Sequence, residues 1–517
     1  MNRLAVINVV GLTEGLIGEH TPRIAEFRKR GALAHIVPAF PAVTCTAQSN
    51  YLTGKLPSQH GIVGNGWYHR DLAEIQFWKQ SNHLVQSPKI WDALRASIPD
   101  ARTRTPDPFA TANLFWWFNM YSTVDYSLTP RPMYPADGRK VFDVYSRPYS
   151  IRTEIKRELG EFPFFGFWGP AAGVDTPQGR ADAVSRWIAG AAKWTEIKYQ
   201  PSLNLIYLPH LDYNLQRHGA YVGGTGVSPV FSGVPPENLS KPHPAGIQRD
   251  AEFNRRDACS TNPKIFADLH AIDNIVGDLI DFFGKRGVQV VLLSEYGITN
   301  VDTPVHLNRL FRERGWLAVK DELGLEILDA GASKVFAVAD HQVAHIYLNP
   351  DAGSGLEKSV RELLEQTDGV ESVLGRTEKI AAGIDHSRAG DLIAVARENA
   401  WFTYYYWLDD ARAPDFARTV DIHRKPGFDP VELFLDPTIS SPKLKIAWRL
   451  LQKRLGFRML MDLVPLDATL VKGSHGRRPA DKKDWPVFIT GRSEILSAKE
   501  IESTDVYQIL LRQIFDK

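Results

Sequence analysis

Short runs of apolar, β-branched residues recur along this chain and most restrict what it can fold into. The clearest runs are residues 3–10, 32–39, 204–208 and 288–293. They show little polar alternation, as strands do when helices cover a parallel sheet on both sides. Candidate helices lie between them, including residues 181–198 and 268–286. The pattern predicts an α/β fold with a mostly parallel central sheet and helices on both faces.

The same pattern divides the chain into parts. We expect residues 1–304 to form the α/β core, residues 305–464 its C-terminal part, and residues 465–517 a return to the core. The middle part has strand candidates at residues 335–338 and 343–348 and a helix candidate at residues 356–367. These elements make either more of the sheet or a small cap.

Residues 221–264 do not follow this alternation of strand and helix candidates. They contain Gly-Gly, Pro-Pro and Lys-Pro-His-Pro, and they show no sustained apolar period. A structureless stretch of this length is unusual inside a compact domain. We therefore expect a flexible surface insertion there.

Composition and charge exclude several classes of protein. Hydrophobic residues make up 44% and charged residues 23% of the chain, which are ordinary globular values. The 61 basic and 60 acidic residues leave a net charge of +1, with no overall footprint for nucleic acid or an anionic membrane. Two cysteines make no disulfide framework, and no apolar run of about 18 residues occurs. We expect no signal peptide in the apolar start of the sequence. We expect a cytoplasmic protein with a small-molecule substrate and no nucleic-acid or membrane partner.

Thr44 is the first candidate for chemistry. It follows the strand expected at residues 32–39 and falls where a helix that includes residues 47–52 should begin. A hydroxyl in that position meets unpaired N–H groups and the positive end of the helix dipole. This setting favours an alkoxide and suits an anion such as phosphate. A plain N-cap is the alternative, since Thr often fills that role.

The residues around Thr44 resemble the nucleophile segment of a known family. The matching positions are Pro41, Thr44, Thr53-Gly54, Pro57, His60-Gly61-Ile62 and Asn65. Their spacing resembles the nucleotide pyrophosphatase/type I phosphodiesterase branch of the alkaline phosphatase superfamily. The resemblance implies an alkaline-phosphatase-like fold, a covalent nucleophile at Thr44, and an Asn65 that helps to hold the phosphoryl oxygens.

The resemblance also implies divalent metal ions. Two such ions about 4 Å apart deprotonate a hydroxyl nucleophile and stabilise the charge on phosphorus. The family takes its ligands from several places along the sheet. Asp212, in Pro209-His-Leu-Asp212, and His475, in Gly473-Ser-His-Gly476, match two of these places.

Other ligand places are altered. Val10 stands where the family has Asp, and Asn8 and Glu14 are weak substitutes nearby. Gln216 stands where the family has His, four residues after Asp212. Glu295 and Tyr296 replace an Asp-His pair; Glu keeps an oxygen ligand, whereas a neutral phenol is a poor one. The resemblance implies zinc, the harder oxygen donors favour magnesium, calcium or manganese, and a site without metal stays open.

Two further pairs are weaker candidates for the lost ligands. Asp421 and His423 would share one face of a strand, although a solvated loop is the simpler interpretation. Asp340-His341 ranks below that pair because it leads into the apolar strand expected at residues 343–348.

Two loops are candidates for substrate contacts. Arg131 and Arg139 lie in a proline-rich loop that could close over a phosphate, since Arg binds phosphate with two hydrogen bonds. Residues 113–121 are dense in aromatics, which either stack on a ring of the substrate or belong to the core. Cys45 is expected to be a small packed residue, because helix geometry turns it roughly 100° from Thr44.

These residues predict a hydrolase that cleaves a phosphoric ester or anhydride through a phosphothreonine at Thr44. Val10, Gln216 and Tyr296 motivate a different interpretation, a non-hydrolytic binding protein on the same fold. A third is an esterase or transferase with one metal ion or none.

Overall fold

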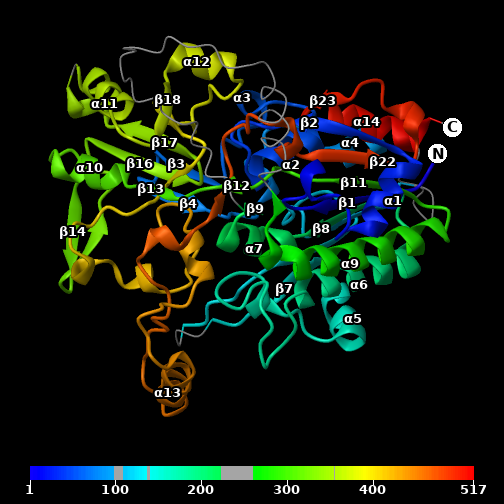
Figure 1. Ribbon diagram of the computed structural model, residues 1–517, viewed down its shortest axis with the longest axis horizontal. Coiled ribbons are helices and arrows are strands. Elements are labelled where there is room, and N and C mark those ends of the chain that lie inside the picture. The colour runs from blue at the N-terminus through cyan, green and yellow to red at the C-terminus, as the bar shows by residue number, and fades with distance from the viewer. Residues whose placement is uncertain (98–108, 137–139, 223–259, 354, 517) are drawn as a thin grey trace, which may run out of the picture.

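The computed structural model describes residues 1–97, 109–136, 140–222, 260–353 and 355–516 (Figure 1). A nine-stranded mixed sheet forms its larger half, in the order β23-β2-β22-β11-β1-β8-β5-β6-β7. The strands are β1 (Leu4–Val9), β2 (Ala32–Val37), β5 (Thr111–Leu114), β6 (Tyr126–Pro130), β7 (Val144–Arg147), β8 (Leu203–Leu208), β11 (Gln289–Leu293), β22 (Val487–Thr490) and β23 (Glu500–Glu502). Only β22 and β7 run antiparallel to their neighbours.

Helices cover both faces of this sheet. One layer is α1 (Pro22–Arg30), α6 (Ala183–Tyr199), α7 (His210–His218) and α9 (Phe266–Gly284), with α5 (Ser150–Leu159) beside α6. The other layer is α2 (Thr44–Thr53), α4 (Ile90–Ala96) and α14 (Asp505–Phe515), with α3 (Pro57–His60) following α2. All residues of β1 and β8 are buried, which explains why those runs lack polar alternation. The predicted α/β class with a mostly parallel central sheet is confirmed.

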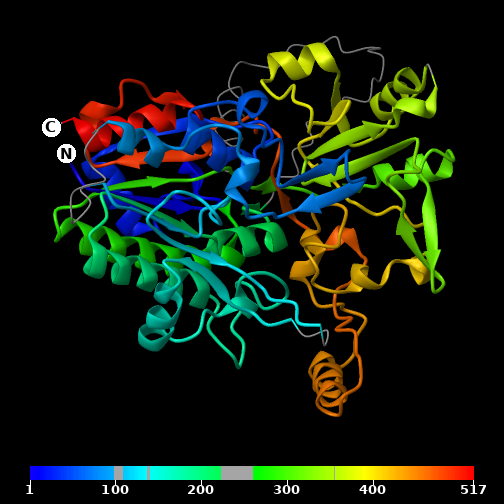
Figure 2. The same ribbon diagram turned by 180° about the vertical axis from the view of Figure 1, so that it is seen from behind.

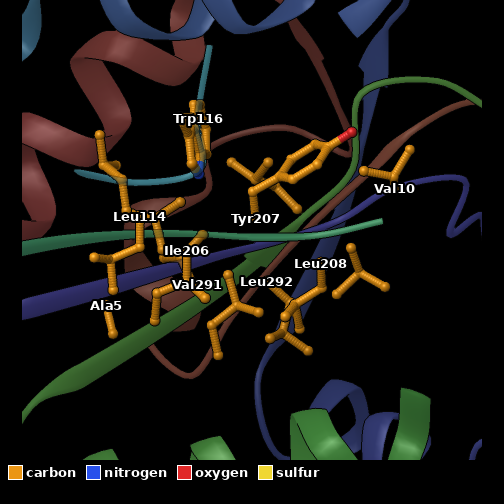
Figure 3. Packing of buried hydrophobic residues seen from close by; sticks show 14 of the residues in the cluster. Ala5, Val10, Leu114, Trp116, Ile206, Tyr207, Leu208, Val291 and Leu292 are labelled. Carbon is orange, nitrogen blue, oxygen red and sulfur yellow. The ribbon is translucent and has the colours of Figure 1, made fainter. Parts of the chain in front are cut away.

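The core of the larger half lies between the sheet and its helices. Figure 3 shows side chains of β1, β5, β8 and β11 packed together, with Val10 beside Tyr207 and Leu208. Val10 has no exposed surface. The end of β1 is therefore sealed by apolar packing.

A four-stranded antiparallel sheet forms the other half of the molecule (Figure 2). Its order is β16 (Val335–Asp340), β17 (Val343–Leu348), β19 (Leu392–Ala396) and β18 (Val370–Leu374), with α10 (Leu307–Glu313), α11 (Leu356–Glu365) and α12 (Arg376–Ala381) around it. The strands and the helix predicted in this part are confirmed. They form a sheet separate from the central one, with a hydrophobic core of its own.

Short two-stranded sheets lie outside the nine-stranded and four-stranded sheets. They are β3 (Gly66–His69) with β4 (Glu74–Phe77), β9 (Tyr221–Val222) with β10 (Ser260–Thr261), β12 (Thr299–Asn300) with β21 (Gly473–Ser474), β13 (Thr303–Val305) with β20 (Ala400–Phe402), and β14 (Val319–Glu322) with β15 (Leu325–Leu328). Most of the insertion predicted at residues 221–264 lies outside the described residues. Its two described ends pair with each other as β9 and β10.

One helix stands apart from both halves. α13 (Pro442–Arg454) projects from the body in both views and has no buried residue (Figures 1 and 2). Within the described part of the chain, no helix combines the length and the apolar character needed to cross a membrane.

Candidate active site

The candidate site lies at the carboxyl ends of the central strands. The segments after β1, β2, β8 and β11 all leave the sheet at this edge, because these four strands run in the same direction. Open α/β sheets bind their ligands at such an edge. The β16–β17 hairpin of the second sheet also reaches it, so both halves of the molecule contribute side chains.

Thr44 is the first residue of α2 and is only 3% exposed. Its hydroxyl lies 3.3 Å from the hydroxyl of Tyr296, which in turn donates to Oδ1 of Asp212 at 3.2 Å. Since the Tyr296 proton is directed to Asp212, Thr44 is the donor in its own bond to Tyr296. The three groups form a directed chain of hydrogen bonds from the hydroxyl to the carboxylate.

Asp212 lies in the first turn of α7, after β8. Its second oxygen, Oδ2, accepts a hydrogen bond from Nε2 of Gln216 at 2.8 Å, one turn along the helix. Burial raises the pKa of Asp212 to about 7, against the opposing effect of the hydrogen bonds from Tyr296 and Gln216. The carboxyl group therefore changes protonation state near neutral pH.

Glu295 directly precedes Tyr296 and is fully buried. Its Oε1 accepts hydrogen bonds from Asn8 and Gln48, each at 2.5 Å. Burial raises the pKa of Glu295 to about 8, and the hydrogen bonds from Gln48 and Asn8 oppose that rise. A neutral carboxylic acid therefore predominates behind Thr44 at pH 7.

Four aromatic rings form a continuous stack beside Thr44. Tyr296 stacks on His475 at 3.6 Å between ring centroids, His475 contacts His341 at 3.6 Å, and His341 stacks on Phe428 at 3.7 Å. Nδ1 of His475 is 2.7 Å from the carbonyl oxygen of Ala42, so it carries the ring proton. Burial lowers the pKa of His475 to about 3 and that of His341 well below its ordinary value. Both imidazoles are neutral.

Asn65 is held by the tip of the second sheet. Its backbone N–H and its side-chain Nδ2 donate to the two oxygens of Asp340 at 2.8 and 3.0 Å. Its Oδ1 accepts from the backbone N–H of Cys45, the residue after Thr44, at 3.1 Å. Asp340 thus fixes Asn65 against the start of α2, and burial raises the pKa of Asp340 to about 7.

A pocket opens in front of Thr44. It encloses about 540 Å³, counting the space that opens to solvent. Its aromatic walls are Trp78, Trp117, Phe167, Trp168, Tyr207, Tyr213, Tyr296 and Phe428. Asp212 is the acidic side chain among the described residues that line it, and no lysine or arginine is among them. The described lining therefore offers no fixed positive charge to an anion.

These residues do not fit a centre of two divalent ions. Val10 offers no donor, and burial raises the pKa of the Tyr296 phenol well above its ordinary value, so Tyr296 stays neutral. Both oxygens of Asp212 accept hydrogen bonds from neighbouring side chains. Nε2 of His475 is buried without a hydrogen-bond partner, but a single open nitrogen does not make a site. Among the described residues, no group of three or more His, Cys, Asp or Glu side chains could hold a metal ion.

The structure brings six of the candidate metal or catalytic residues together in the pocket and leaves others outside. Thr44, Asp212, Gln216, Tyr296, His341 and His475 line the pocket, with Glu295 and Asn65 directly behind. Candidates that do not line it include Glu14, Arg131, Asp421 and His423.

The excluded side chains have other partners. Glu14 contacts Arg28 and lies 2.7 Å from His35, and Asp421 forms an ion pair with Lys140 at 3.2 Å. Arg131 is exposed, and Arg139 lies outside the described residues. A role for either arginine in binding substrate stays a prediction.

The sequence pattern did not reveal that residues of the second sheet reach the site. Asp340-His341 was ranked below Asp421-His423, yet it is the pair that reaches the site, because the hairpin turns at residues 341–342 and points back at the central sheet. His341 has a positive φ of 62°, a backbone conformation that a sequence pattern does not reveal. Tyr207 and Phe428 were missed as well, since each is one aromatic residue among many.

The expectations for neighbouring residues are met. Cys45 is fully buried in a small hydrophobic cluster. Of the two adjacent tryptophans in the aromatic run, Trp116 packs in the core and Trp117 lines the pocket.

Comparison with known proteins gives a family and a fold. The family model described as type I phosphodiesterase / nucleotide pyrophosphatase matches residues 4–429. No curated protein sequence matches the chain significantly.

Solved structures share the whole architecture at low sequence identity. Phosphonoacetate hydrolase from Sinorhizobium meliloti, in complex with phosphonoformate, is 14% identical with a TM-score of 0.54, over 98% of this chain and 94% of that one. An inactive variant of murine ectonucleotide pyrophosphatase / phosphodiesterase 5, in complex with AMP, is 13% identical with a TM-score of 0.52, over 99% and 95%. The human ectonucleotide pyrophosphatase / phosphodiesterase 5 gives 13% and 0.53 over the same shares.

Proposed function

Because this chain belongs to the type I phosphodiesterase / nucleotide pyrophosphatase family of hydrolases, we propose that it cleaves a small phosphoric ester or anhydride through a phosphothreonine at Thr44. The observation that carries the proposal is the chain of hydrogen bonds from Thr44 through Tyr296 to Asp212. It gives the hydroxyl a route for its proton at the point where the pocket meets the N-terminus of α2.

The proton route supplies the first step. As the Thr44 oxygen forms its bond to phosphorus, its proton passes to the Tyr296 oxygen and the Tyr296 proton passes to Asp212. The bond from phosphorus to the leaving oxygen breaks, and that oxygen takes a proton from water. With a pKa of about 7, Asp212 is ionised in a large share of molecules at neutral pH, as a general base must be.

The second step reverses the first. A water molecule attacks the phosphothreonine and gives one proton to the hydroxide that the first step left in solvent. The bond from phosphorus to the Thr44 oxygen breaks, and Asp212 returns its proton through Tyr296 to that oxygen. The product leaves with the oxygen of water, and the enzyme regains its starting protonation. Neither step needs a metal ion, although metal binding at Asp212, Glu295, His475, Gln216 and Tyr296 stays a prediction from the resemblance.

The charge of the pocket favours a diester over a monoester. A monoester carries close to two negative charges at neutral pH, and the described lining offers no lysine or arginine to balance them. A diester or an anhydride end with a single charge is accommodated more readily by the N–H groups at the start of α2. The aromatic walls suit a ring or an apolar group on the same substrate.

Turnover and trapping test the proposal together. We expect wild type to hydrolyse bis-p-nitrophenyl phosphate at least about tenfold faster than p-nitrophenyl phosphate, and Thr44→Ala to lose at least about 1,000-fold. Thr44→Ser, which keeps a hydroxyl, should retain measurable turnover. Acid quenching during turnover, followed by mass spectrometry, should find phosphate on the peptide that contains Thr44.

Equal turnover by wild type and Thr44→Ala would overturn the nucleophile assignment. Turnover that Thr44→Ala abolishes, but with no phosphopeptide trapped, would leave a hydrolase without a covalent intermediate.

A non-hydrolytic binding protein is the second candidate. The observation that favours it is the neutral, hydrogen-bonded state of the groups that replace the metal ligands of the family, above all Tyr296 and Gln216. Calorimetry with bis-p-nitrophenyl phosphate or AMP separates the two candidates. Saturable binding to wild type without turnover of either compound would support the binding protein.

A further inference from the structure

The projecting segment at residues 442–460 is attached to the body by few contacts. Lys445 and Arg449 of α13 form ion pairs with Asp462 at 3.0 and 2.9 Å. No residue of the helix is buried, so none of its faces belongs to either hydrophobic core. The segment therefore contributes little to the packing of the enzyme.

An apolar stripe runs along α13 and faces solvent. Leu444, Trp448, Leu451 and Leu455 follow one another at intervals of four, three and four residues, which places them on one side of an α-helix. Their exposed fractions are 71, 57, 44 and 64%, and Phe457, just beyond the helix, is 65% exposed. Monomeric proteins rarely leave such a contiguous apolar face in water.

Positive charge surrounds the stripe. Residues 442–458 contain six basic residues and no acidic one; the basic residues are Lys443, Lys445, Arg449, Lys453, Arg454 and Arg458. Lys445 and Arg449 are neutralised by Asp462, while the other four form no ion pair with any residue that the structure describes. The net charge of +1 for the whole chain hides this local excess.

We propose that α13, together with the residues that follow it to Leu460, lies on an anionic lipid bilayer as an interfacial segment. The occupant is argued from charge complementarity: the stripe would enter the boundary between headgroups and acyl chains, and the lysines and arginines beside it would meet lipid phosphates and carboxylates. Trp448 belongs in such a boundary because indole has an apolar body and a polar N–H. The helix thus adds a membrane-surface site to an enzyme that sequence reasoning expected to have no membrane partner.

Vesicle sedimentation with the full-length protein tests this site. We expect wild type to sediment with vesicles of equimolar phosphatidylcholine and phosphatidylserine, to remain in solution with phosphatidylcholine alone, and to be released by high salt. The triple variant Lys443→Glu, Lys453→Glu and Arg454→Glu should bind about 100-fold more weakly. The triple variant Leu444→Ser, Trp448→Ser and Leu455→Ser should lose more than about 100-fold.

Matched controls keep the result specific. Leu323→Ser changes a fully exposed leucine on the β14–β15 turn and should bind vesicles as wild type does. Both triple variants should keep wild-type circular dichroism and turnover of soluble substrate, because α13 packs in neither core. Equal sedimentation of wild type and the serine variant would overturn the proposal, and so would binding that ignores phosphatidylserine. A concentration-dependent dimer of wild type that the serine variant abolishes, without lipid binding, would assign the stripe to a second copy of the chain instead.

Discussion

By the resemblance to the family, the Tyr296 phenol occupies the place of a metal ligand, and it changes what Thr44 can do. Tyr296 passes a hydrogen bond from Thr44 to Asp212, and its ring lies flat on His475. A metal ion would bind the hydroxyl oxygen and draw off its proton by charge. Here the proton has a path through neutral groups to a carboxylate of raised pKa. The chemistry of the residue therefore depends on a proton acceptor and on its state of ionisation.

Removing the phenolic oxygen tests that path. We expect Tyr296→Phe to lower kcat by about 100-fold, because general base assistance of this size is lost when the relay is broken. Steady-state kinetics on bis-p-nitrophenyl phosphate measure it. Tyr213→Phe is the matched control, since Tyr213 lines the same pocket and its hydroxyl has no hydrogen-bond partner among the described residues. A loss of equal size in both variants would contradict the relay.

The pH dependence of the reaction follows from Asp212. A general base must be deprotonated, so kcat/KM should fall about tenfold for each unit of pH below the pKa of about 7, and level off above it. An aspartate of ordinary pKa would place this limb near pH 4. A pH–rate profile checks the position of the limb. A profile that stays flat down to about pH 5 would show that Asp212 is held ionised, as a bound cation would hold it.

At the scale of elements, the β16–β17 hairpin is the part that completes the site. It reaches across from the second sheet with Asp340 and His341 at its turn. Asp340 binds both N–H groups of Asn65, and Asn65 binds the N–H of Cys45 at the start of α2. The position of α2 is thus linked to the other half of the molecule through two side chains.

Breaking that link should cost stability as well as activity. We expect Asp340→Ala to lower the free energy of unfolding by about 3 kcal/mol, because two buried donors of Asn65 lose their acceptor. Asp340→Asn keeps one acceptor oxygen and should lose less than half as much. Urea unfolding of the three proteins provides the comparison. An equal loss of unfolding free energy in the two variants would mean that the charge of the Asp340 carboxylate, and not its pair of acceptor oxygens, stabilises the contact between the β16–β17 hairpin and Asn65.

The elements that sequence reasoning recovered are those whose signal is local. β1, β8 and β11 are continuous apolar runs, and Thr44 stands at a strand-to-helix junction that its neighbours define. Asp340 and His341 carry no such signal, because their role depends on how one sheet docks against another. α13 was missed for a different reason: a whole-chain charge and a search for spanning segments do not detect a short basic helix with one apolar face.

On the scale of the whole molecule, the chain keeps the fold of its family while altering the centre of the site. Alignment over nearly the whole length with a phosphonoacetate hydrolase and with a nucleotide pyrophosphatase / phosphodiesterase shows that the architecture is retained. Of the altered residues, Val10 and Tyr296 follow the ends of β1 and β11, and Gln216 lies in the second half of α7. The fold therefore tolerates different proton chemistry at one edge of the sheet without rearranging.

Chelation tests whether the turnover and the stability of the protein depend on a bound metal ion. We expect incubation with EDTA, followed by desalting, to leave turnover and thermal unfolding unchanged, because the described side chains offer no multidentate site. Metal analysis of the purified protein should find less than one ion per chain. Loss of turnover in EDTA, restored by a stoichiometric divalent ion, would contradict the metal-free mechanism.

The burial of Val10 bears on how such a site can arise. An aspartate at that position would lie at the sealed end of β1 beside Tyr207 and Leu208, with no cation among the described residues to balance it. An unpaired buried charge costs about 3–5 kcal/mol, which is a large fraction of the stability of a typical domain. A variant in which aspartate replaces Val10, with no other change, should therefore fold less stably. The valine therefore makes a return to aspartate at this position costly to the stability of the fold.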